Sequence, residues 1–176
     1  PMMIKSFNAV AQSVDNAHLL IVGSGAVEDL LKEMANQAPS AENIHFTGRI
    51  PYDELPDYLS MCDVFVTAST SEVHPLSVIE AMATGLPVLG ITSPGIGDTV
   101  EDGVTGLLST NDPMIFTAKM MRLCLDSELR KEMSAAALEA SNQYSIENTG
   151  AIMLSHYERL VNQTESRRQG IGYNLR

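Results

Sequence analysis

Two glutamates near the middle of the chain are the residues best placed to bind a ligand. Glu72 and Glu80 stand in the segment TASTSEVHPLSVIEAMATGLP, residues 67–87, on either side of a predicted helix start. The segment begins at the end of an apolar, β-branched stretch typical of a buried strand, and Pro75 is favoured in the first turn of a helix. The order is therefore strand, polar turn, helix, with Glu72 in the turn and Glu80 on the helix.

The start of this predicted helix has the chemistry of an anion site. Free backbone N–H groups near Pro75, Leu76 and Ser77, together with the positive end of the helix dipole, favour a diphosphate. Glu72 lies beside that site, where a carboxylate accepts hydrogen bonds from sugar hydroxyls. Glu80 lies further along the helix, which rises about 1.5 Å per residue, on the far side of the phosphates. One carboxylate could then hold a transferred sugar and the other a ribose.

A simpler interpretation stays open for the two glutamates taken alone, in which Glu72 complements the helix dipole and Glu80 is a solvated helix residue. The surrounding pattern, S-x-x-E-x7-E-A-M-A-x-G-L-P-V, favours the binding interpretation. It resembles the signature of the retaining, nucleotide-sugar-dependent glycosyltransferases of family 4 and their relatives of GT-B fold. The matching residues are Ser69, Glu72, Glu80, Ala81, Met82, Ala83, Gly85, Leu86, Pro87 and Val88.

The resemblance extends over most of the chain. HLLIVGSGAVEDLLKEM is similar to the family's second strand, glycine loop and helix, and NIHFTGRIPYDELPDYLSMCDVFV to its third strand, helix and fourth strand. SPGIGDTVEDGVTGLL is similar to the family's loop and hairpin before the last strand. The resemblance implies a hexosyltransferase that moves a sugar from a UDP-, GDP- or ADP-linked donor to an acceptor hydroxyl, keeping the anomeric configuration. It implies no cofactor and no bound metal.

The resemblance also implies roles for individual residues. Glu72 would be the catalytic-centre residue that orients the donor sugar, and Glu80 would hold the ribose. The further donor-binding positions are His74, Pro75, Leu76, Ser77, Gly23, Gly25, Arg49 and Ile50, the last two bordering the base.

One stretch departs from the family, because most relatives have Glu-Gly-Phe-Gly-Leu where this chain has Glu-Val-His-Pro-Leu at residues 72–76. Two glycines that approach the sugar are thus replaced by bulkier residues, and Pro75 removes one N–H. This departure keeps a degenerate nucleotide-sugar-binding module open as an alternative. A sugar-nucleotide hydrolase or epimerase on the same two-domain fold is another.

A dinucleotide-binding fingerprint is the rival interpretation of Gly23-Ser24-Gly25. That fingerprint requires a third glycine, where this chain has Glu28, and an acidic residue at the end of the next strand, where it has Gly48 and Arg49. Both departures argue against the NAD interpretation.

Alternating helix and strand patterns predict an α/β fold, a Rossmann-like three-layer α/β/α arrangement with a mostly parallel sheet and C-terminal helices. The predicted strands are 18–23, 43–48, 63–67, 87–91 and 105–108, with a short turn near 96–100. The predicted helices are 2–14, 26–37, 53–61, 75–84, 113–126, 127–142 and 146–168.

The chain begins with a helix where the alternation leads us to expect a strand. The resemblance implies that the family's first, central strand is missing, with the Arg and Lys that neutralise the donor diphosphate; neither is assigned to Lys5 or Arg49. We expect residues 1–165 to be a donor-binding C-terminal half, without its N-terminal acceptor-binding domain and inactive alone. Residues 166–176 form a tail, and we hypothesise that Ile171–Leu175 docks as a strand in the gap.

Composition limits the partners. A chain of 176 residues that is 44% hydrophobic suits one domain, and a net charge of −11 argues against nucleic acid or an anionic membrane surface. Cys62 and Cys124 stand alone in apolar runs, so we expect reduced thiols. With neither a membrane span nor a signal sequence recognisable, we expect a cytoplasmic location.

Overall fold

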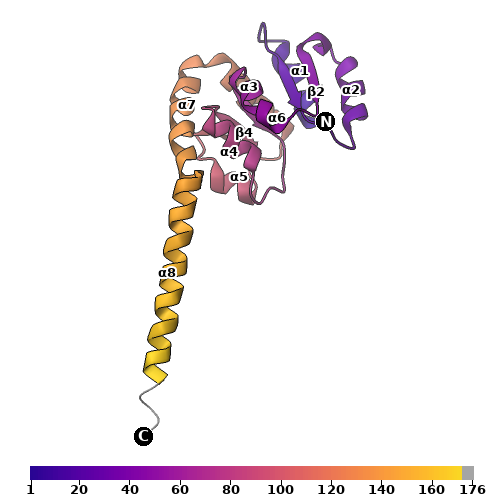
Figure 1. Ribbon diagram of the computed structural model, residues 1–176. Coiled ribbons are helices and arrows are strands. Elements are labelled where there is room, and N and C mark those ends of the chain that lie inside the picture. The colour runs from indigo at the N-terminus through magenta and orange to yellow at the C-terminus, as the bar shows by residue number, and fades with distance from the viewer. Residues whose placement is uncertain (172–176) are drawn as a thin grey trace. The chain divides into compact units, whose positions relative to one another are not determined.

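The computed structural model describes the backbone of residues 1–171 and the side chains of residues 1–164 (Figure 1). It forms two compact units, residues 1–140 and the residues from Ser141 onward. The strands are β1 (Leu19–Val22), β2 (Ile44–Gly48), β3 (Phe65–Thr67), β4 (Val88–Ile91) and β5 (Gly106–Ser109). The α-helices are α1 (Met2–Ala11), α2 (Glu28–Asn36), α3 (Leu55–Ser60), α4 (Leu76–Ala83), α5 (Pro94–Thr99), α6 (Pro113–Leu125), α7 (Ser127–Ser141) and α8 (Ile146–Ile171). Short 3₁₀ helices are η1 (Ala41–Asn43), η2 (Tyr52–Glu54) and η3 (Asn142–Tyr144).

The named strands of the described residues pair in parallel, which confirms the predicted α/β class. They form two sheets rather than one: β1 pairs with β2, and β3, β4 and β5 follow in that order. Within residues 1–171 no named strand joins the two sheets.

The largest core lies between the strands and two helices that are distant in sequence. Ile4, Phe7 and Val10 stand on one face of α1, and they share this core with Phe116 and Leu123 of α6. The three α1 residues are spaced three apart, as expected for the apolar face of an amphipathic helix. Each fully buried side chain of this size contributes about 1.5–3 kcal/mol of hydrophobic free energy. Burial of these two apolar faces therefore holds α1 and α6 against the strands.

Glycines allow α5 and β5 to approach β4 closely. A Cβ atom added at Gly90 would lie 2.7 Å from a methyl carbon of Ile96, and one at Gly106 would lie 2.1 Å from the carbonyl oxygen of Val88. Neither distance is sterically possible. Ile96 is fully buried with Val78 of α4 in a second core. Gly90 therefore makes room for Ile96 of α5, and Gly106 allows β5 to pair with β4.

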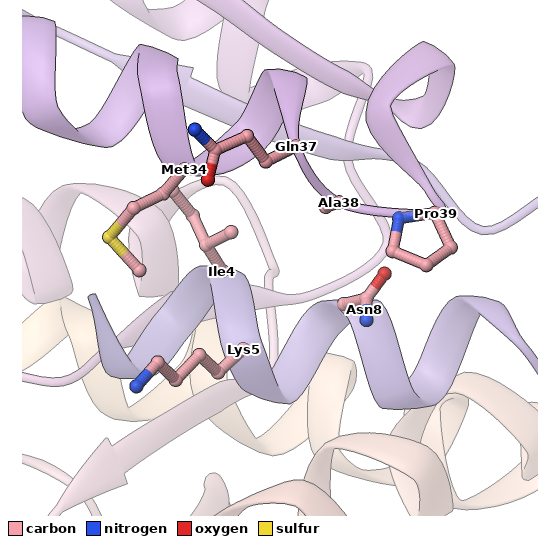
Figure 2. A pocket seen from close by; sticks show the side chains of 7 residues that line it. All are labelled: Ile4, Lys5, Asn8, Met34, Gln37, Ala38 and Pro39. Atoms are coloured by element: carbon pink, nitrogen blue, oxygen red, sulfur yellow. The ribbon is translucent and has the colours of Figure 1, made fainter.

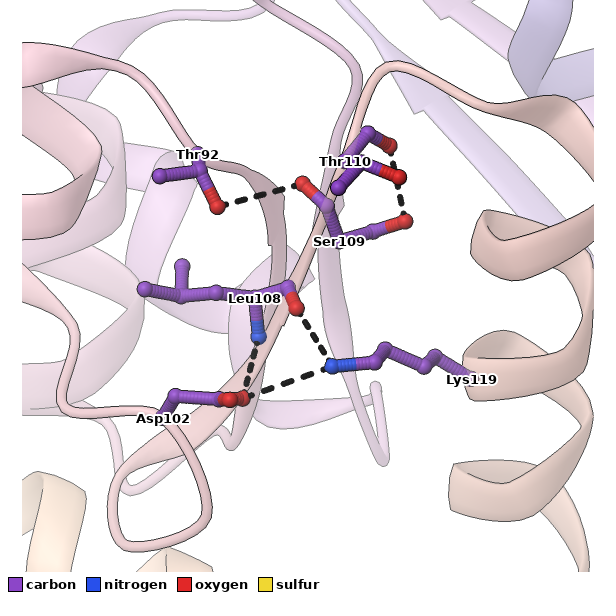
Figure 3. Close-up of polar contacts among 6 residues, drawn as sticks. All are labelled: Thr92, Asp102, Leu108, Ser109, Thr110 and Lys119. Carbon is purple, nitrogen blue, oxygen red and sulfur yellow. Dashed lines mark hydrogen bonds and ion pairs between the residues drawn. The ribbon is translucent and has the colours of Figure 1, made fainter.

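A polar contact fastens α6 to the hairpin before β5 (Figure 3). Asp102 accepts a hydrogen bond of 2.7 Å from the Leu108 N–H, and Lys119 of α6 lies 3.6 Å from the same carboxylate. Lys119 also donates to the carbonyl oxygen of Leu108. Gly103, with φ of 82°, makes the turn that brings Asp102 back to the strand.

Several predicted element boundaries were wrong. The first helix ends at Ala11 rather than at residue 14, because the N–H groups of Ser13 and Val14 both bond to the carbonyl of Val10 and the regular ladder stops. The predicted turn near 96–100 is the short helix α5, which begins at Pro94. The sequence signal for this helix is the proline at its first position.

The last helix extends further than the sequence predicted. α8 runs to Ile171, three residues beyond the predicted end, so Ile171 is helical rather than the first residue of a strand. The rest of the proposed docking strand, residues 172–175, lies outside the described residues. The predicted domain boundary at residue 165 stays a prediction.

Candidate functional site

The predicted ligand-binding residues follow the carboxyl ends of three strands. Gly23 and Gly25 come after β1, Arg49 and Ile50 after β2, and Glu72 in the loop after β3. Ligands of open parallel sheets bind in the crevice beyond these strand ends, which is where the loops are free to carry binding groups. The positions of the loops relative to one another therefore decide whether a site exists.

A glycine pair joins the loops after β1 and β2. The Gly23 N–H donates to the carbonyl oxygen of Gly48 at 2.9 Å, and the two residues have φ values of 110° and 65°. Only glycine adopts such angles readily, so both positions are constrained by the backbone. A Cβ at Gly25 would meet nothing within 4 Å. Arg49 follows this junction with an exposed side chain that makes no hydrogen bond or ion pair among the described contacts.

The first residues of α4 are exposed, but Pro75, which directly precedes them, is buried. Leu76 is 59% exposed, and the Ser77 side chain is exposed as well. Of the three predicted anion-binding positions, Pro75 has no N–H, and the Leu76 N–H donates to the carbonyl of His74 at 3.0 Å. Within the described hydrogen bonds the Ser77 N–H has no partner. The open part of the predicted anion site is therefore the Ser77 amide and the helix dipole.

The backbone of the loop that carries Glu72 packs against the start of α5. The Gly95 N–H donates to the carbonyl oxygen of Glu72 at 2.9 Å, and a Cβ at Gly95 would lie 2.6–2.7 Å from backbone atoms of Glu72 and Val73. The Glu72 side chain is half-buried and that of His74 is exposed. Nearby, Ser93 is buried, and its hydroxyl has no hydrogen-bond partner.

Glu80 is directed toward the loop that follows β2. Its Oε1 accepts a hydrogen bond of 2.7 Å from the hydroxyl of Tyr52, in η2. This hydrogen bond, together with the negative charge of Glu80, raises the pKa of Tyr52. Tyr52 is 77% exposed, so the contact holds an otherwise free aromatic side chain beside α4. The structure thereby connects Glu80 to the segment that contains Arg49 and Ile50.

Three residues of this region were not identified from the sequence. Tyr52 binds Glu80, Gly95 supports the Glu72 loop, and Ser93 lies buried at the start of α5. The only sequence signal for Tyr52 was its place shortly after the Gly48-Arg49 pair. Glu72 lies in the loop before α4, and Glu80 lies within α4.

A pocket of about 270 Å³ lies elsewhere, between α1 and α2 (Figure 2). Its lining includes Ile4, Lys5 and Asn8 of α1 and Met34 of α2, and no predicted donor-binding residue contributes to it. Lys5 therefore lines this pocket, whereas Arg49 does not. In the described part of the chain no group of three His, Cys, Asp or Glu side chains is arranged to hold a metal ion.

Comparison with known proteins identifies the family. The sequence matches the model of the family described as "Glycosyl transferases group 1" over residues 1–140. The chain belongs to this family. It is 30% identical over 145 residues to the GDP-mannose-dependent alpha-(1-6)-phosphatidylinositol monomannoside mannosyltransferase of Mycobacterium tuberculosis, an alignment that covers 78% of this chain and 38% of that enzyme. The chain spans 24% to 41% of the length of the curated relatives it matches.

Solved structures confirm the GT-B-type, Rossmann-like fold. The pneumococcal O-GlcNAc transferase GtfA, crystallised with UDP and GlcNAc, superimposes with a TM-score of 0.79 at 24% identity, covering 92% of this chain and 32% of that one. The C-terminal domain of a glycosyl transferase group 1 family protein (LpcC) from Francisella tularensis gives 0.73 at 22% identity, covering 82% of this chain and 78% of that domain. The chain therefore has the fold of that C-terminal domain. None of its described helices is long and apolar enough to span a membrane.

Proposed function

We propose that residues 1–140 bind the donor of a retaining glycosyltransferase that transfers a hexose from a nucleoside diphosphate to an acceptor hydroxyl. The observation that carries the proposal is the exposed first turn of α4, at Leu76 and Ser77, which directly follows the Glu72 loop. In the same helix, Glu80 accepts a hydrogen bond from Tyr52, which follows β2. Family membership supplies the reaction class. UDP, GDP and ADP are the candidate leaving groups.

Each group at this end of α4 has a part in the proposed reaction. The Ser77 N–H and the helix dipole would bind the diphosphate, Glu72 would orient the sugar and Glu80 would bind the ribose hydroxyls. The His74 side chain is exposed, and Arg49, which follows β2, is an exposed cation with no ion pair among the described contacts. Preorganised N–H groups and cations stabilise a departing diphosphate directly, so we propose that no metal ion is needed.

The proposal extends to the longer protein and its location. We infer that an N-terminal domain supplies the acceptor site and further basic groups, and that residues 1–176 alone do not turn over. A cytoplasmic enzyme fits the two cysteines, which are free, and burial raises the pKa of both thiols.

Calorimetric titration of the intact protein with UDP, GDP and ADP tests the donor site. Glu80→Ala should weaken binding of the best nucleotide by about 1–3 kcal/mol, because a charged hydrogen-bond acceptor is lost. Glu132→Ala is the matched control, since Glu132 is an exposed glutamate on α7. Absence of binding by all three nucleotides, or equal losses in the two variants, would refute the proposed donor site.

Product analysis tests the reaction. The intact protein should give a glycoside with the donor's anomeric configuration, and the rate should persist in EDTA. Free sugar as the sole product would favour the hydrolase alternative instead. A product of inverted configuration would refute the retaining mechanism.

A degenerate binding module is the second candidate, and one observation favours it. Val73 is 87% exposed and replaces a glycine of the family, while the Leu76 N–H is already used by His74. Nucleotide binding without any sugar transfer by the intact protein would support this candidate. Restoring glycine at Val73 and Pro75 should then strengthen donor binding.

A further inference from the structure

Tyr52 makes an unusual contact for an exposed aromatic residue. Its side chain is 77% exposed, yet its hydroxyl donates a 2.7 Å hydrogen bond to Glu80, 28 residues away in the sequence. We propose that Tyr52 is a positioning residue that holds the Glu80 carboxylate in the orientation that binds a ribose diol. The inference rests on the proposed function, because it assigns a task to the ribose end of that site.

The hydrogen-bonding capacity of a carboxylate favours positioning over blocking. An ionised carboxylate has about four lone-pair directions, and Tyr52 occupies one of them on Oε1. No other described side chain donates to Glu80. Two hydroxyls of a ribose can therefore bind while the Tyr52 bond remains. A free glutamate side chain has several rotamers, so a fixed one loses less conformational entropy when a ligand binds.

The same bond holds the loop that borders the predicted base site. This loop is fixed at its beginning by the hydrogen bond from Gly23 to Gly48 and at its end by the bond from Tyr52 to Glu80. Arg49 and the segment after it lie between these two anchors. A hydrogen bond to an ionised group is stronger than one between neutral groups, which suits it to this task.

A ligand comparison tests the inference in the intact protein. The probes are the nucleoside diphosphate that binds best among UDP, GDP and ADP, and its 2′,3′-dideoxy form, which lacks the ribose hydroxyls. Tyr52→Phe keeps the ring but removes the donor. We expect it to weaken binding of the ribonucleotide about 3- to 10-fold and to leave binding of the dideoxy nucleotide unchanged within about 2-fold.

Two further variants make the result specific. Tyr157→Phe is the matched control, because Tyr157 is an exposed tyrosine on α8, and it should change neither affinity. Glu80→Ala should abolish the effect of Tyr52→Phe on ribonucleotide binding. Equal losses for the two ligands in Tyr52→Phe, no loss, or tighter binding would each overturn the positioning role.

The proposed function and this inference fail in different ways. If the wild-type protein binds none of the three nucleotides, the donor site itself is refuted and the role of Tyr52 falls with it. If binding depends on Glu80 but not on the Tyr52 hydroxyl, only the present inference is overturned. Circular dichroism of each variant shows that a lost affinity does not come from unfolding.

Discussion

Gly95 supports the loop that carries Glu72, so adding one methyl group there should displace the loop. In Gly95→Ala the new Cβ would lie 2.6 Å from the carbonyl oxygen of Val73 and 2.7 Å from that of Glu72. These are backbone atoms, which cannot rotate away as a flexible side chain can. Either the loop or the start of α5 must move, and the 2.9 Å hydrogen bond from Gly95 to Glu72 is then weakened.

The size of the effect follows from three contributions. Overpacking costs about 1–3 kcal/mol, and the loss of one hydrogen bond costs about 1 kcal/mol. The better helix propensity of alanine returns at most about 1 kcal/mol. We therefore expect Gly95→Ala to lower the free energy of unfolding by about 2 kcal/mol, which for a chain of this length corresponds to a fall in Tm of about 4–8 °C.

The assay is urea denaturation followed by circular dichroism, combined with hydrogen exchange of the peptide that contains residues 68–76. Gly97→Ala is the matched control in the same helix, because a Cβ at Gly97 meets nothing within 4 Å. It should leave stability unchanged or raise it by up to about 1 kcal/mol. Equal stability of the two variants, or unchanged exchange in the 68–76 loop of Gly95→Ala, would refute the claim that Gly95 positions Glu72.

Three further outcomes are expected. Asp112→Ala should lower the free energy of unfolding by about 1 kcal/mol, because the Asp112 carboxylate caps α6. It accepts hydrogen bonds from the N–H groups of residues 114 and 115 at 2.8 and 3.2 Å. An unchanged midpoint in urea denaturation would contradict this. Gly106→Ala should lower the free energy of unfolding by at least about 3 kcal/mol or prevent folding, since β5 cannot then pair with β4. Gly150→Ala is the control, because a Cβ at this helix position meets nothing within 4 Å, and it should leave stability unchanged. In an alkaline absorbance titration, Glu80→Gln should lower the pKa of Tyr52 toward its ordinary value of 10.0. Because this pKa is raised on folding, the contact stabilises the protein below about pH 10 and is lost as the pH rises through the folded-state pKa; identical titrations of wild type and Glu80→Gln would contradict it.

Local patterns predicted most of the elements well. The stretch before Ser69 predicted β3, and the apolar spacing with Pro75 predicted α4, which begins at Leu76. Such signals succeed because hydrophobic period, proline geometry and helix capping act within a few residues. The errors lie at element ends and in short elements: α1 stops early at Ala11, and α5 forms where only a turn was expected.

The sequence by itself determined the α/β class, the family resemblance, and the placing of Glu72 in a turn and Glu80 on a helix. Only the tertiary structure decided that the strands form two sheets, that Tyr52 binds Glu80, and that Gly95 supports the Glu72 loop. The physical reason is the separation of the interacting residues along the sequence. Helix starts and strand patterns arise from adjacent residues, whereas these contacts join segments far apart in the sequence and exist only after the cores have brought the elements together.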